Sequence, residues 1–190
     1  ILKKQMGKSI MVGKYLLNLE EERMMKKKKK KWSIEDSDDL VSICNAVSRT
    51  YLSNRLPFPY TEDNAKWWLG MVEENEGSNG IFRSISVDDK IVGNISVERK
   101  DDVFCKDAEI GYFLLTEYWS KGIMTEAVRQ ICQIAFDELD ILRITGLVYN
   151  PNNASKKVLE KNGFAMEGTM KQAVVKDGSI YDLCILGKLR

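Results

Sequence analysis

The strongest chemical signal in the sequence is a turn of eight residues, Tyr118 to Thr125, between an apolar segment and an amphipathic one. The preceding residues, Ala108 to Leu115, are apolar and aromatic, which is typical of a short buried strand. The following apolar side chains recur at helical spacing, at Met124, Ala127, Val128, Ile131, Ala135 and Leu139. A strand-to-helix turn directs unpaired backbone N–H groups and the positive end of a helix dipole to one point. We therefore expect this turn to suit a phosphate group.

The sequence contains no histidine, and this excludes several kinds of chemistry. Histidine-based Ser-His-Asp and Cys-His nucleophiles and the HExxH zinc site all need that side chain. The four cysteines are far apart and mostly lie within apolar patterns, so we interpret them as reduced core thiols: Cys44, Cys105, Cys132 and Cys184. Acid or base chemistry must use carboxylates, hydroxyls, lysine, tyrosine or backbone groups, and no metal is expected.

Charge is distributed unevenly along the chain. Residues 1–32 carry 11 Lys/Arg against 3 Glu, whereas residues 33–190 carry 18 Lys/Arg against 25 Asp/Glu. The acidic part would not attract nucleic acid by itself, and it favours cationic partners such as amines. We predict an N-terminal basic extension at residues 1–31 and a single domain at residues 32–190.

The six lysines of residues 26–31 have two interpretations. They form either a solvated basic segment or lysine-rich edge strand, or a contact for RNA, the ribosome or an anionic membrane. The run contains neither arginine nor interleaved aromatic residues, so the first interpretation is favoured.

The pattern around the turn predicts a mixed α/β sheet. The expected elements are a helix beginning within 33–39, a helix capped by Thr61, strands at 81–87, 91–97 and 108–115, the long helix, a strand at 143–149, a short helix ending at Gly163, and a hairpin around Asp177-Gly178. The strand, long helix and next strand form one right-handed crossover with parallel strands. The sequence therefore predicts helices flanking one mixed sheet.

Four blocks of this sequence occur in a recognisable order, at residues 108–114, 118–127, 153–164 and 167–168. Together they resemble the GNAT superfamily of acetyl-CoA-dependent N-acetyltransferases, and within it the branch that includes the ribosomal-protein N-terminal acetyltransferases. The likeness covers about Trp32 to Leu189. The superfamily's signature loop, Gln/Arg-x-x-Gly-x-Gly/Ala, aligns with Trp119 to Met124, where only Gly122 keeps the signature type. The expected pyrophosphate contacts survive this divergence because backbone N–H groups make them.

The resemblance implies acetyl-CoA as cosubstrate. It implies that the strands at Ala108 and Arg143 splay apart near Leu114, so that the pantetheine arm pairs with strand backbone. Asn153 would hydrogen-bond that arm, and Ser155 would lie near the thioester sulfur. The implied cofactor-binding residues are Phe113, Leu114, Lys121, Gly122, Ile123, Met124, Thr125, Asn150, Asn153, Ser155 and Lys156.

Ser155 is one of two candidate catalytic residues. The resemblance makes it the donor to the departing CoA thiolate, while its position in the first turn of a helix also explains it as a cap that competes with Asn153. A thiol leaving group with a pKa of about 8 to 9 needs little acid assistance, so we expect a reduced rate without this donor, not a complete loss.

Glu109 is the other candidate, as the base that takes a proton from the acceptor ammonium. In the alternative interpretation, Glu109 is a carboxylate at the end of a strand that pairs with a lysine or faces solvent. Tyr112 and Tyr181 are weaker base candidates because an ordinary tyrosine pKa is about 10. The favoured mechanism is direct transfer, with a backbone N–H of the Leu114 strand stabilising the oxyanion. No acetyl-enzyme is required, and Cys132 is expected to be inert within the long helix.

The acceptor is expected to be a primary amine, either a small molecule or a protein N-terminus. Four aromatic residues pack in the core or form an acceptor-pocket wall: Phe58, Tyr60, Trp67 and Trp68. The rival functions are a non-catalytic acetyl-CoA-binding module and a ribosome- or RNA-associated protein that uses the lysine run. No apolar run is long enough to cross a bilayer, so we expect a cytoplasmic protein without membrane or nucleic-acid partners, and a homodimer is left open.

Overall fold

The computed structural model describes residues 30–190, which are built around one seven-stranded sheet. The expectations for residues 1–29, including most of the lysine run, lie outside the described residues. The last two lysines form the edge strand β1 (Lys30–Lys31), which pairs antiparallel with β2. Lys31 Nζ lies 3.3 Å from a Glu76 carboxylate oxygen. The end of the lysine run is therefore part of the folded sheet.

The sheet is mixed, as the sequence predicted. Its spatial order is β1-β2-β3-β4-β5-β7-β6. The strands beyond β1 are β2 (Gly80–Val87), β3 (Lys90–Arg99), β4 (Asp107–Leu114), β5 (Arg143–Tyr149), β6 (Ala165–Lys176) and β7 (Ser179–Leu189). Only β4 and β5 are parallel, and the other neighbouring pairs are antiparallel. A crossover helix must therefore join β4 to β5.

Two tight turns close the hairpins of this sheet. Asp88 and Asp89 join β2 to β3 with φ angles of 50° and 63°, and Asp177 and Gly178 join β6 to β7 with φ angles of 49° and 77°. Left-handed conformations at both central residues are typical of a type I′ turn, whose twist matches that of the strands. The hairpin predicted around Asp177-Gly178 is confirmed, and the strands predicted at 81–87 and 91–97 form the other hairpin.

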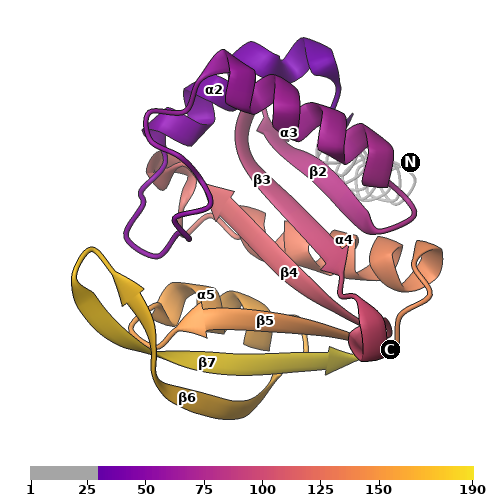
Figure 1. Ribbon diagram of the computed structural model, residues 1–190, viewed down its shortest axis with the longest axis vertical. Coiled ribbons are helices and arrows are strands. Elements are labelled where there is room, and N and C mark those ends of the chain that lie inside the picture. The colour runs from indigo at the N-terminus through magenta and orange to yellow at the C-terminus, as the bar shows by residue number, and fades with distance from the viewer. Residues whose placement is uncertain (1–29) are drawn as a thin grey trace, which may run out of the picture.

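Helices cover the two faces of the sheet unequally (Figure 1). On one face, α2 (Ser37–Ala46) packs against β3 and α3 (Glu62–Asn75) packs against β2. On the other face lie α4 (Ile123–Glu138) and α5 (Asn153–Glu160). Among the described residues, no helix covers β4, β5 and β7 on the α2–α3 face. This part of the molecule is the open face.

The core explains why the predicted helices form. All six apolar residues of the stripe predicted for the long helix are buried, five on α4 and Leu139 directly after its end. Thr61 caps α3 by accepting a hydrogen bond from the Asn64 N–H, and the Thr61 N–H donates to the Asn64 side-chain oxygen. α5 ends at Glu160, and the turn that follows reaches Gly163, whose φ of 81° suits a position just after a helix, with Phe164 buried behind it.

Of the four aromatic residues predicted to pack in the core or to line an acceptor pocket, two are core residues and two are not. Tyr60 is buried, and the Trp68 ring lies 5.6 Å from that of Trp32 and 6.2 Å from that of Phe82, so core packing is confirmed for these two. Phe58 and Trp67 are 68% and 73% exposed, so neither is a core residue.

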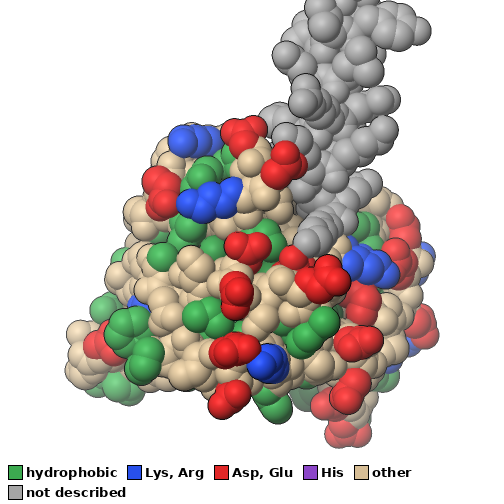
Figure 2. All heavy atoms as spheres, turned by 90° about the horizontal axis from the view of Figure 1, so that it is seen from above, with side chains coloured by type: hydrophobic (Ala, Val, Ile, Leu, Met, Phe, Trp, Pro, Cys, Tyr) green, Lys and Arg blue, Asp and Glu red, His purple; other side chains and the backbone are tan. Residues whose placement is uncertain are grey.

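Acidic side chains gather on the face that Figure 2 shows. The exposed acidic residues of the two helices at this end are Asp38 and Asp39 of α2 and Glu62, Asp63, Glu73 and Glu74 of α3. Four of them lie in the first turns of their helices, where the helix dipole favours a negative charge. None of the helices in residues 30–190 is long and apolar enough to span a membrane.

Candidate active site

The site is built around the point where β4 and β5 part. The two strands pair only from Asp107 opposite Arg143 to Glu109 opposite Thr145. Beyond these pairs they diverge, and Figure 1 shows β4 turning away from β5 towards its C-terminal end. The family resemblance implied separation near Leu114, whereas pairing already ends at Glu109.

The parted edge of β4 presents backbone groups. The Leu115 N–H donates to the Val92 oxygen at 2.9 Å, and Gly93 lies opposite Leu114. In an antiparallel ladder this pattern directs the N–H and C=O of Leu114 away from β3, towards the gap. The Leu114 C=O accepts a hydrogen bond from the Trp119 indole at 2.8 Å. In residues 30–190 no strand pairs with this edge near Tyr112 and Leu114.

The turn after β4 has the geometry of an anion site. Ser120 and Gly122 adopt left-handed φ angles of 59° and 75°, and Gly122 is the N-cap of α4. A glycine cap provides no side-chain acceptor, and the first intrahelical bond in this turn runs from the Glu126 N–H to the Gly122 oxygen. The N–H groups of the first turn therefore point outward, as helix N-termini do when they bind phosphate. A Cβ added at Gly122 would meet open space.

The predicted residues of this turn lie together. The side chains of Ile123 and Met124 are buried, which fixes the start of α4 against the core. The Thr125 oxygen accepts a hydrogen bond from the Asn162 amide at 3.0 Å, which ties the start of α4 to the end of α5. The Lys121 ammonium lies 5.3 Å from the centre of the Tyr118 ring and is exposed.

The start of α5 lies on the α4–α5 side of the gap. Asn152 is its N-cap, and its side chain accepts a hydrogen bond from the Ser155 N–H at 3.1 Å. The prediction that Ser155 or Asn153 caps this helix is therefore wrong, because Asn152 stands three residues before the donor. The spacing Asn-x-x-Ser would have identified the cap. The Asn153 side chain is exposed.

Ser155 instead contacts the sheet. Its hydroxyl lies 2.7 Å from the Tyr112 hydroxyl, which comes from β4. Burial raises the pKa of Tyr112 to about 12, although the hydrogen bond with Ser155 opposes the shift. Tyr112 therefore stays protonated near neutral pH and is a poor base. Sequence reasoning considered the two residues separately and missed their contact.

Two other predicted cofactor residues lie near the start of α5. The Lys156 ammonium donates to the Asn150 backbone oxygen at 2.8 Å. The Asn150 side-chain oxygen accepts from the Cys184 thiol at 3.2 Å. Both residues fasten the loop between β5 and α5.

Glu109 lies on the opposite side of the sheet from Ser155. On β4 the residues Ala108 and Ile110 are buried, whereas Glu109 and Gly111 are exposed, so the Glu109 side chain faces the open side. The Glu109 side chain keeps contact with solvent, yet the surrounding protein raises its pKa by desolvation, against the opposing charges of Lys100 and Arg55. Among the described residues no ion pair involves Glu109.

The remaining candidates are less suited to chemistry. The Tyr181 ring stacks on that of Tyr149 at 5.9 Å. Cys132 is buried within α4, and burial raises its pKa to about 11, so little thiolate forms. All four cysteines are free. In residues 30–190 no three His, Cys, Asp or Glu side chains form a cluster that could hold a metal ion.

A mixed sheet with one parted parallel pair, followed by a crossover helix whose first-turn N–H groups are open to an anion, describes the fold and its candidate site. Residues 30–165 match the family model described as "Acetyltransferase (GNAT) domain". The chain belongs to this family.

Relatives and solved structures agree with this assignment. The chain is 38% identical over 117 residues to "Probable N-acetyltransferase YjcK" of Bacillus subtilis, covering 62% of this chain and 64% of the relative. It is 26% identical over 146 residues to "Ribosomal-protein-serine acetyltransferase" of Escherichia coli, covering 75% and 81%. Matches to YjcK and to a second B. subtilis relative span 64% and 61% of those proteins, less than two thirds of their lengths.

The fold is shared with RimL, a ribosomal L7/L12 alpha-N-protein acetyltransferase solved in complex with coenzyme A. The TM-score is 0.73 at 20% identity, over 83% of this chain and 90% of that chain. The GNAT fold predicted from the sequence is confirmed.

The cap of α5 gives a direct test of this geometry. We expect Asn152→Ala to lower the free energy of unfolding by about 1 kcal/mol, because the Ser155 N–H loses its acceptor. Asn153→Ala is the matched control, and its effect should stay within about 0.5 kcal/mol. Urea denaturation monitored by circular dichroism measures both values. Equal losses in the two variants would contradict the assignment of Asn152 as the cap.

Proposed function

We propose that the protein transfers an acetyl group from acetyl-CoA to a primary amine by direct attack. The observation that carries this proposal is the gap between β4 and β5, which leads to the N-terminus of α4, where the Gly122 cap offers no side-chain acceptor. One end of the gap suits an extended chain that pairs with strand backbone, and the other suits a phosphate. Acetyl-CoA has both parts.

The residues of the turn and strand fit this cosubstrate. The N–H groups of Gly122, Ile123, Met124 and Thr125 would hold the pyrophosphate, with Lys121 adding positive charge. The backbone of Phe113 and Leu114 would pair with the pantetheine arm. Asn153 would bind the same arm through its exposed amide. Asn150 and Lys156 would shape the loop beside it, since they already bond to each other.

Glu109 and Ser155 approach the gap from opposite faces of the sheet, which suits acid and base roles. Glu109 takes one proton from the acceptor ammonium, directly or through a water. The amine nitrogen then bonds to the thioester carbon, and the carbonyl oxygen that gains the electron pair faces the Leu114 N–H. The carbonyl re-forms as the carbon–sulfur bond breaks, and the nitrogen loses a second proton while the sulfur gains one from Ser155. One proton remains in excess, and Glu109 releases it to solvent.

Ser155 would donate to the departing sulfur. Tyr112 supports this role because its protonated hydroxyl can donate to Ser155 at 2.7 Å, leaving the serine proton directed elsewhere. The free cysteines support a reducing compartment, and we infer a cytoplasmic location.

A thiol-release assay with acetyl-CoA tests the proposed function against a panel of amines that includes small molecules and peptides with free N-termini. We expect amine-dependent release of CoA. CoA binding without release for any amine would favour the rival non-catalytic module. RNA binding that weakens with salt, together with no response to CoA, would favour the second rival.

Gly122→Glu tests the pyrophosphate site. The change places a negative charge beside the expected phosphates, so stabilisation by CoA should vanish; at a hundred times the Kd this stabilisation is about 2.7 kcal/mol. Thermal denaturation with and without CoA measures it. Gly77→Glu is the matched control, because Gly77 also has a left-handed φ of 79° and open space around it. A Gly122→Glu protein that CoA still stabilises would show that the phosphates bind elsewhere.

Glu109→Gln tests the base. The raised pKa of Glu109 means that the basic form appears at higher pH than for an ordinary carboxyl group, so the wild-type kcat/KM should rise through that pKa. We expect Glu109→Gln to lose about 10² to 10⁴-fold in kcat/KM near neutral pH, and much less near the acceptor's own pKa, where the amine needs no base.

Glu98→Gln is the control for that profile. Glu98 lies opposite Glu109 and its charge raises the Glu109 pKa, so its removal should move the acid limb of the profile to lower pH while turnover persists. An unchanged pH profile in Glu109→Gln would exclude the base role.

A further inference from the structure

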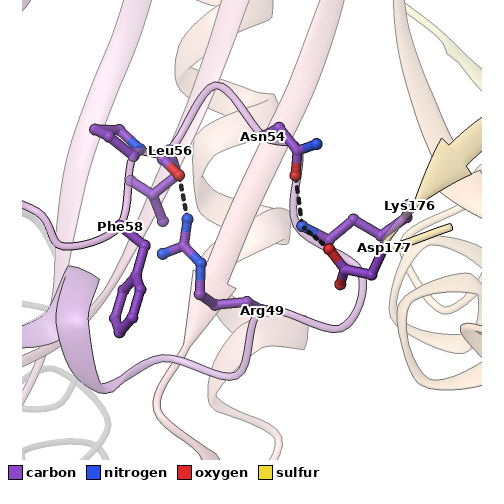
Figure 3. A pocket seen from close by; sticks show the side chains of 7 residues that line it. Arg49, Asn54, Leu56, Phe58, Lys176 and Asp177 are labelled. Atoms are coloured by element: carbon purple, nitrogen blue, oxygen red, sulfur yellow. Dashed lines mark hydrogen bonds and ion pairs between the residues drawn. The ribbon is translucent and has the colours of Figure 1, made fainter.

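A pocket of about 340 Å³ lies between the loop after α2 and the turn of the β6–β7 hairpin. Its lining residues are Arg49, Asn54, Leu56, Pro57, Phe58, Lys176 and Asp177. In Figure 3, Lys176 extends from the β6–β7 hairpin towards Asn54, and the Arg49 guanidinium lies beside Leu56 and Phe58. The residues come from segments more than a hundred positions apart, so the sequence alone did not reveal the pocket.

Lys176 is the less usual of the two cations because it is only 6% exposed. Its ammonium donates to the neutral Asn54 side-chain oxygen at 2.6 Å. The nearest carboxylate oxygen belongs to Asp177, at 3.9 Å, and the Asp177 side chain is 77% exposed. Solvent screens such a distant contact, so the buried ammonium is only weakly neutralised.

Arg49 forms the other wall. Its guanidinium donates to the backbone oxygens of Leu56 and Cys44 and lies 5.2 Å from the centre of the Phe58 ring. These contacts fix the plane of the guanidinium but bring no negative charge. Within residues 30–190 no carboxylate forms an ion pair with Arg49. The pocket therefore holds two cations and one peripheral anion.

The loop that lines the pocket also approaches the proposed reaction centre. It carries Tyr51, whose ring lies 6.1 Å from that of Tyr149 at the end of β5. The same loop carries Arg55, whose charge lowers the Glu109 pKa. Figure 1 shows this loop and the β6–β7 turn on the side towards which β4 and β5 diverge. A molecule in the pocket thus lies beside the open face that carries Glu109.

We propose that this pocket binds an anionic group, a carboxylate or a phosphate, on the same molecule as the acceptor amine. This inference rests on the proposed function. The acceptor would then be a zwitterion, with its ammonium near Glu109 and its anion between Arg49 and Lys176. Charge-assisted hydrogen bonds from a guanidinium and an ammonium suit both kinds of oxyanion. The positive charges of Arg49 and Lys176 thus disfavour polyamines in the pocket, although the acidic surface of the protein would attract them.

Titration calorimetry on the CoA-loaded full-length protein tests the pocket without requiring turnover. The probes are O-phosphoethanolamine and β-alanine, each compared with ethanolamine, which has the amine and no anion. We expect at least one anionic probe to bind about tenfold or more tightly than ethanolamine. The phosphate and carboxylate arms show which anion the pocket prefers. Equal binding of all three probes, or no detectable binding of either anionic probe, would overturn the proposal.

Variants assign the effect to the two cations. Lys176→Gln and Arg49→Gln should each lower the affinity for the preferred anionic probe about tenfold and leave ethanolamine unchanged. Lys176→Arg keeps the positive charge and should retain most of the affinity for the anionic probe. Lys171→Gln is the matched control, because Lys171 also lies on β6 and is 78% exposed beside Asp182. If Lys176→Gln does not fold, Arg49→Gln decides, and unchanged anion affinity in that variant would refute the assignment.

Turnover on the same probes separates this inference from the proposed function. Anion-dependent binding without CoA release would refute acetyl transfer to these amines while supporting the pocket. Acetylation of ethanolamine as efficiently as of both anionic probes would support acetyl transfer and refute the pocket's role.

Discussion

The site depends on a short hydrogen-bonded ladder that ends early. β4 and β5 share three residue pairs and then separate, although each continues as a strand. Buried backbone N–H and C=O groups need hydrogen-bond partners. A strand edge without a neighbouring strand therefore costs free energy unless water or a ligand pairs with it. β3 holds one side of β4 over seven pairs, and β7 holds one side of β5 over seven pairs. The separation is therefore a fixed feature of the sheet.

The helices keep this gap in place. α5 lies close to β5 because Gly146 has no side chain: a Cβ there would be 2.6 Å from Leu159 Cδ1 and 3.5 Å from Ile110 Cγ2. Asn162 links the end of α5 to the first turn of α4. The start of α4, the parted edge of β4 and Ser155 thus belong to one packed unit, and a shift in any of them would displace the others.

The sequence predicted features that depend on local patterns. The buried stripe of α4, the Thr61 cap and the Asp177-Gly178 turn follow from spacing and conformational preference, and the structure has them. It did not reveal contacts between distant residues. Tyr112 and Ser155 are 43 positions apart, and Lys176 and Asn54 are 122 apart. No periodic pattern encodes such pairs, because they depend on how the sheet and loops fold back. The helix cap at Asn152 was not predicted, although the Asn-x-x-Ser spacing is a local pattern that indicates it.

Trp119 changes what defines the loop that follows β4. Its indole N–H holds the Leu114 oxygen, so the side chain at this position fastens the loop to the strand. Ser120 and Gly122 then set the path of the chain through two left-handed φ angles. The conformation of the loop depends on backbone dihedral angles and one anchoring hydrogen bond. Most of its positions therefore do not need one particular amino-acid type. A search for this loop by backbone torsion angles would therefore find relatives that a search for the signature sequence misses.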